Sequence, residues 1–148
     1  MKLLLYAEET NRAGLRLQRM LEIFEMGIDI KVYRTIDSLA HGLLQPDISY
    51  DGTIAVLLAH SKKELQSLLS IRDLITDVRV IMVLPDREDD TIKKGFLLYP
   101  RLVTYVDGDF VLIAAVLKKM IARINSNKKH VGFFEESGGC SDDMQTST

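Results

Sequence analysis

The chain has 148 residues, of which 47% are hydrophobic, so it is long enough to form one domain with a sizeable core. A formal charge of -2 argues against electrostatic binding to nucleic acid, and a single cysteine excludes an internal disulfide. The apolar N-terminal run is too short for a signal peptide or a membrane span. We therefore expect a cytoplasmic protein in a reducing compartment that binds neither nucleic acid nor a membrane.

Short apolar runs along the chain predict five β-strands. They are Lys2–Ala7, Asp29–Arg34, Thr53–Leu58, Arg79–Leu84 and Leu102–Val106. Nearly continuous apolar character is typical of strands that are buried on both faces. Because helix-like segments separate the runs, the pattern predicts an α/β fold in which helices cover both faces of a parallel sheet.

The segments between these runs predict helices. They are about Arg12–Met26, Ile36–Leu44, a helix that follows Ser61 and includes Ile75, Glu88–Tyr99, and Phe110–Asn125. Thr35 and Asp109 are expected N-caps, and Ser61 with Glu64 has the spacing of a capping box. Polar residues dominate from Ser126 onward, which predicts a folded domain over residues 1–125 and a flexible polar tail over 126–148.

The opening segment Lys2–Glu9 is an apolar strand followed by an acidic pair. Together with five βα units at this length, it resembles the receiver domain of bacterial response regulators, of which the chemotaxis response regulator is one. The resemblance covers about residues 1–125. It implies a bacterial protein of two-component signal transduction or a phosphorelay. It also implies a (βα)5 flavodoxin-like three-layer sandwich with strand order 2-1-3-4-5.

Receivers bind magnesium and accept a phosphoryl group on an aspartate, and the resemblance implies where each part of that pocket lies. The metal-binding acid pair falls at Ala7 and Glu8, the acceptor at Leu57 or Leu58, the hydroxyl residue at Leu84, and the lysine at Asp107 or Gly108. Leucine offers no attacking oxygen, and Asp107 places a negative charge where phosphoryl transfer needs a positive one. We therefore predict a degenerate pseudo-receiver that is not an enzyme and has no catalytic residues, no metal and no cofactor.

In receivers, the surface formed by helix 4, strand 5 and helix 5 is the usual face for dimerisation and output. The apolar segment Phe96–Tyr99 maps to this surface, and the last predicted helix is apolar around more than one face. The candidate interface residues are Lys93, Lys94, Leu97, Leu98, Tyr105, Leu117 and Ile121. We predict a signalling module that acts by protein–protein interaction, with a partner protein or a second copy of the chain as a homodimer.

Other interpretations stay open. One is a small flavodoxin-like enzyme or ligand-binding protein, although Glu8–Gly14 is neither a Ser/Thr-rich phosphate loop nor a Gly-x-Gly-x-x-Gly motif. Another is a receiver that binds a cation through Glu8 and Glu9 with Asp86 or Asp107. His60 is a candidate phosphoacceptor or metal ligand, although a histidine without a ligand-spaced partner is more often neither.

Overall fold

A five-stranded parallel sheet forms the centre of the computed structural model, which describes residues 2–8, 12–24, 29–46, 48, 52–76, 78–108 and 110–137. The strands are β1 (Lys2–Tyr6), β2 (Asp29–Tyr33), β3 (Thr53–Leu58), β4 (Arg79–Leu84) and β5 (Leu102–Tyr105). Their order in the sheet is β2-β1-β3-β4-β5. The predicted fold class, the five strands and their order are therefore confirmed.

The central strand β3 has no solvent exposure along most of its length. Ile54 through Ala59 are each 0% exposed, and β1 pairs with β3 so that Tyr6 lies opposite Leu57. Burial on both faces explains why the strand is a continuous apolar run and does not alternate.

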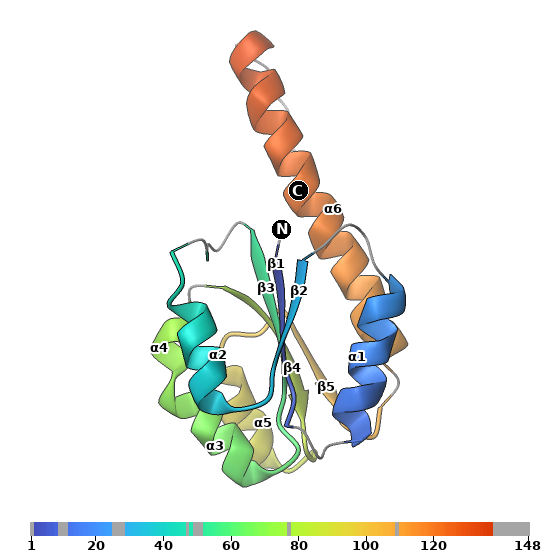
Figure 1. Ribbon diagram of the computed structural model, residues 1–148. Coiled ribbons are helices and arrows are strands. Elements are labelled where there is room, and N and C mark those ends of the chain that lie inside the picture. The colour runs from blue at the N-terminus through green and yellow to red at the C-terminus, as the bar shows by residue number, and fades with distance from the viewer. Residues whose placement is uncertain are drawn as a thin grey trace. The chain divides into compact units, whose positions relative to one another are not determined.

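Helices cover both faces of the sheet (Figure 1). The helix α1 (Arg12–Phe24) lies on one face and buries Leu17 and Leu21. The opposite face carries α2 (Ile36–Leu43), α3 (Lys62–Ser70), α4 (Arg72–Ile75) and α5 (Asp89–Phe96). The core on that second face joins sheet residues such as Leu4 to helix residues such as Leu68.

The helices after β3 and β4 differ from the predictions. The single helix expected after Ser61 is divided at Ile71, whose backbone (φ -113°, ψ 22°) is not helical, so α3 and α4 are separate. The helix α5 ends at Phe96, three residues before the predicted end at Tyr99. Tyr99 itself has a positive φ of 52°. The following proline, Pro100, disfavours a helical conformation at Tyr99, which contributes to the early end.

The expected N-cap at Thr35 is confirmed, because its side chain accepts a hydrogen bond from the backbone of Ser38 within a capping box. Ser61 likewise accepts from the backbone N–H of Glu64 at 3.1 Å. The Glu64 side chain, however, bonds to the backbone of His60 and not to that of Ser61. The N-cap prediction for Asp109 lies outside the described residues.

The last helix, α6 (Val111–Ser137), is longer than the predicted Phe110–Asn125. The change of structure expected at residue 126 therefore does not occur before residue 137. Adding a residue to an existing helix costs far less than starting a new one, so a polar segment with lysines and glutamates can continue it. Residues 138–148, including Cys140, lie outside the description.

The chain forms two compact units, Met1–Ala114 and Ala115–Thr148, and their boundary falls within α6. The predicted domain limit at residue 125 stays a prediction. Among the described residues, no helix combines the length and apolar character that a membrane span needs.

Replacing Leu57 by alanine tests the packing of the central strand. Leu57 is 0% exposed, so Leu57→Ala leaves a cavity and is expected to lower the free energy of unfolding by about 2–5 kcal/mol. Denaturant unfolding followed by circular dichroism measures the change. The control is Leu15→Ala on α1, where the side chain is 43% exposed and the expected change is within about 0.5 kcal/mol. Equal effects of the two variants would contradict the described packing.

Candidate functional site

A groove of about 560 Å³ lies at the carboxyl ends of β1 and β3. These strands are neighbours, but the chain continues from β1 to α1 on one face and from β3 to α3 on the other. Such a switch point is where open α/β sheets bind ligands. Glu8 and His60, which follow the two strands, line the groove together with the helix N-caps Thr35 and Ser61.

A buried carboxylate, Glu64, organises this groove from the first turn of α3. The residue is 6% exposed and accepts three hydrogen bonds. The Tyr6 hydroxyl donates to Oε2 at 2.8 Å, and the backbone N–H of His60 donates to Oε1 at 3.0 Å. The third bond joins the same Oε1 to Nδ1 of the His60 ring at 2.6 Å. One side chain therefore links the end of β1, the loop after β3 and α3.

The Tyr6 hydroxyl is held in its neutral form. Burial raises the pKa of Tyr6 well above its ordinary value, and the hydrogen bond to Glu64 and the charges of Glu64 and Glu8 raise it further. A neutral phenol is the form that donates to a carboxylate. Tyr6 is therefore a fixed donor that partly offsets the cost of burying Glu64.

A second carboxylate, Glu8, lies on the other side of the histidine ring. Its Oε1 is 3.7 Å from Nε2 of His60. One ligand atom from each of Glu8, His60 and Glu64 lies within 4.8 Å of the others, which makes them the grouping among the described residues that could share a metal ion. The groove also contains two basic residues, Arg34 and Lys63.

The positions implied by the receiver resemblance are mostly buried and apolar. Ala7, Leu57, Leu58 and Leu84 are each 0% exposed and have apolar side chains. Of those positions at the ends of β1 and β3, Glu8 alone supplies a carboxylate, whereas magnesium prefers several oxygen ligands. The implied magnesium site therefore does not fit these residues.

Asp107, which stands near the position implied for the lysine, is paired with an arginine. Nη1 of Arg87 donates to Oδ2 of Asp107 at 2.9 Å, and this bond lowers the pKa of Asp107 and raises the pKa of Arg87. The guanidinium also lies over the ring of Tyr105, 4.2 Å from its centroid. Arg87 was missed because it precedes α5 and approaches Asp107 only in the folded chain.

The candidate interface residues fall into two groups. Lys93 and Leu97 are exposed, and Lys94 and Tyr105 are partly exposed. Leu98 is 1% exposed because it packs into the core on the α2–α5 face of the sheet.

Leu117 and Ile121 on α6 are 0% and 3% exposed. Because Leu98 is buried within its own compact unit, its side chain presents no surface to a partner there. The interface roles of Leu117 and Ile121 stay predictions. The exposed apolar residues next to Leu98 in the sequence are Phe96, Leu97 and Tyr99, which are 54%, 46% and 80% exposed.

The residues considered for a cation site are not all brought together. Glu9 lies outside the described residues, Asp86 accepts from the backbone N–H of Glu88, and Asp107 pairs with Arg87. Glu8 instead lies near His60, and His60 in turn contacts Glu64. The sequence signal was present, because His60 and Glu64 are four residues apart at the start of a helix.

Comparison with known proteins agrees with the fold. No family model matches the chain, and no curated protein matches it. A solved structure of a proposed pilus assembly-related protein from Burkholderia pseudomallei K96243 superposes with a TM-score of 0.58 at 17% identity, over 82% of this chain and 90% of the other. A proposed pilus assembly protein (CpaE) from Burkholderia thailandensis E264 gives a TM-score of 0.59 at 14% identity, over 82% and 98%. At these identities the likeness establishes the shared fold.

Replacing Tyr6 by phenylalanine tests the buried carboxylate. Tyr6→Phe removes the donor to Oε2 of Glu64 and is expected to lower the free energy of unfolding by about 1–3 kcal/mol. Chemical denaturation at neutral pH measures the change. Tyr99→Phe is the matched control, since Tyr99 is 80% exposed and its hydroxyl should contribute nothing measurable. An unchanged free energy of unfolding in Tyr6→Phe would contradict the described hydrogen bond.

Proposed function

We propose that this protein is a receiver-like signalling module that acts by protein–protein interaction and is not regulated by phosphorylation of an aspartate. The observation that carries the proposal is the end of β3, where Leu57 and Leu58 occupy the positions implied for the acceptor and are 0% exposed. Neither side chain has an oxygen that could attack a phosphoryl donor. The module then works without catalysis of its own.

The comparisons favour a particular setting for such a module. Both similar structures carry names that refer to pilus assembly. We extend this setting to the present chain and place its partner among the proteins that assemble pili or a related surface structure.

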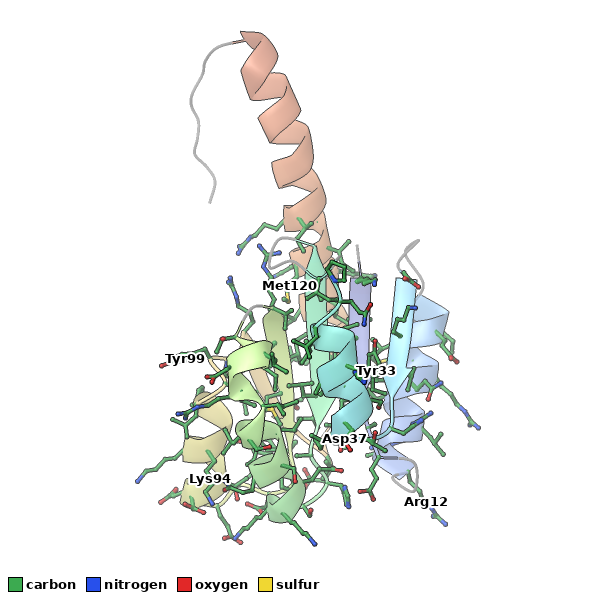
Figure 2. All side chains as sticks on the ribbon, turned by 60° about the vertical axis from the view of Figure 1, so that its left-hand side comes forward. Arg12, Tyr33, Asp37, Lys94, Tyr99 and Met120 are labelled. Atoms are coloured by element: carbon green, nitrogen blue, oxygen red, sulfur yellow. The ribbon has the colours of Figure 1, made fainter. Side chains whose placement is uncertain are left out.

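The exposed apolar residues at the end of α5 are the proposed contact surface. Phe96, Leu97 and Tyr99 define this apolar surface, and Lys93 and Lys94 precede it on the same helix. Figure 2 shows Tyr99 and Lys94 on the same side of the molecule, with Tyr99 at its edge. Clustered exposed apolar side chains are typical of protein interaction sites.

The backbone of Tyr99 supports this assignment. Its φ of 52° lies in the left-handed region, which costs a residue with a Cβ atom about 1–2 kcal/mol. Glycine would avoid that cost, and the exposed ring contributes little to the core. A contact between the ring and a partner accounts for an aromatic residue at this strained position.

The absence of aspartyl phosphorylation can be tested directly. Incubation with acetyl phosphate and Mg²⁺ is expected to give no phosphorylated protein by intact-mass spectrometry, because β3 ends without an acceptor. An authentic receiver domain treated in parallel is the positive control. An adduct that forms on the wild-type chain and persists in His60→Ala would overturn the proposal. Comparison with His60→Ala would then show whether the exposed imidazole had accepted the phosphoryl group.

Replacing Tyr99 by glycine tests the apolar surface with two readouts of opposite sign. Tyr99→Gly is expected to raise the free energy of unfolding by about 0.5–1 kcal/mol, because it relieves the left-handed strain. If the module forms homodimers through this surface, sedimentation velocity should show a concentration-dependent dimer for the wild type and weaker association for the variant. Leu15→Ser, on α1, is the control. Equal association of Tyr99→Gly and wild type would reject self-association through this surface.

A further inference from the structure

We propose that Glu8 and His60 bind a divalent transition-metal ion, with Zn²⁺ the best match, and that Glu64 is the positioning residue that orients the histidine. This inference does not depend on the proposed function. It rests on the geometry of three side chains and on the groove that they line.

The hydrogen bonds to Glu64 fix the tautomer of His60. An ionised carboxylate only accepts hydrogen bonds, and Glu64 receives them from the Tyr6 hydroxyl and the His60 backbone N–H. The ring atom Nδ1, at 2.6 Å from Oε1 of Glu64, is therefore the N–H donor. In the neutral ring, the lone pair then lies on Nε2, which is the nitrogen nearer Glu8.

The lone pair on Nε2 and the carboxylate of Glu8 are two donor atoms close enough to share one metal ion. Nε2 and Oε1 of Glu8 are 3.7 Å apart, which is too long for a direct hydrogen bond. Ligands about 2.0–2.2 Å from a tetrahedral zinc ion lie about 3.4 Å from each other, so a slightly wider angle accommodates this gap. The separation therefore suits a shared metal ion.

The role of Glu64 is the one that a carboxylate commonly has behind a ligating histidine. Such histidines usually donate their other ring N–H to a carboxylate, which holds the ring and makes it a better ligand. Glu64 is itself held by Tyr6 and is 6% exposed, so its position is well defined. The chain of contacts runs from Tyr6 through Glu64 to His60 and then to the metal position.

The donor set favours a transition metal over magnesium. Imidazole is a ligand for zinc, copper, iron and nickel, whereas magnesium prefers oxygen ligands throughout. The His60 side chain is 36% exposed and the Glu8 side chain 44%, and both line the groove. An ion held by these two residues would keep positions open toward the groove for water or a ligand.

Isothermal titration of the full chain with zinc chloride tests the proposal. The titration uses a Cys140→Ser background, because a free thiolate is a strong zinc ligand. His60→Ala and Glu8→Gln are expected to weaken zinc binding at least about tenfold, and Glu64→Gln about 10–100-fold. His41→Ala, exposed on α2, and Glu88→Gln, exposed before α5, are the matched controls and should bind as the parent does. Magnesium chloride should bind more weakly than zinc.

Thermal unfolding provides a second readout beside the titration. Zinc should raise the melting temperature of the parent and of His41→Ala but not that of His60→Ala, and far-ultraviolet circular dichroism verifies that each variant is folded. Since Glu8 and His60 are partly exposed, their variants decide the matter if Glu64→Gln does not fold. Three results would each overturn the proposal. They are no zinc binding by the parent, equal affinities of His60→Ala and His41→Ala, or magnesium binding as tight as zinc binding.

Discussion

The complete burial of β3 is the constraint on which the rest of this structure depends. The strand lies in the middle of the sheet, with β1 and β4 as neighbours, and has no exposed side chain between Ile54 and Ala59. An ionised aspartate at Leu57 or Leu58 would need polar partners to offset its desolvation, and the core cluster that contains Leu57 is largely apolar. The polar groups described at this edge of the sheet, among them Glu8 and His60, come from residues outside β3.

The buried carboxylate of Glu64 is compatible with this apolar edge because its partners are fixed before any ligand arrives. Tyr6 donates from the last residue of β1, and His60 donates from its backbone and its ring. The donors come from β1 and from the β3–α3 loop, so the carboxylate holds β1, this loop and α3 in one arrangement. Removing one of these donors would leave the buried carboxylate short of a hydrogen bond and would lower the free energy of unfolding.

The strands of the sheet could be predicted from the sequence, whereas the contacts of the candidate site could not. Apolar runs such as Lys2–Ala7 identify strands because burial on both faces leaves few alternatives. The break at Ile71 depends on packing that no local pattern encodes. In the sequence, Glu64 is explained equally well by a capping box and by a role in a binding site. Tyr6, which donates a hydrogen bond to it, lies 58 residues away. Leu98 belongs to an apolar segment that the sequence assigned to an interaction surface. Its place in the core is visible only in the folded chain.

The proposed metal site and the apolar surface occupy different parts of the same compact unit. His60 and Glu64 belong to the start of α3, whereas Phe96, Leu97 and Tyr99 lie at the end of α5. The helices α3 and α5 are in contact, and Lys62 pairs with Glu88 where they begin. That ion pair is solvent-exposed, and screening weakens such pairs, so it gives little reason to expect coupling. Substitutions at the two places should therefore have additive effects on stability, and a failure of one proposal leaves the other intact.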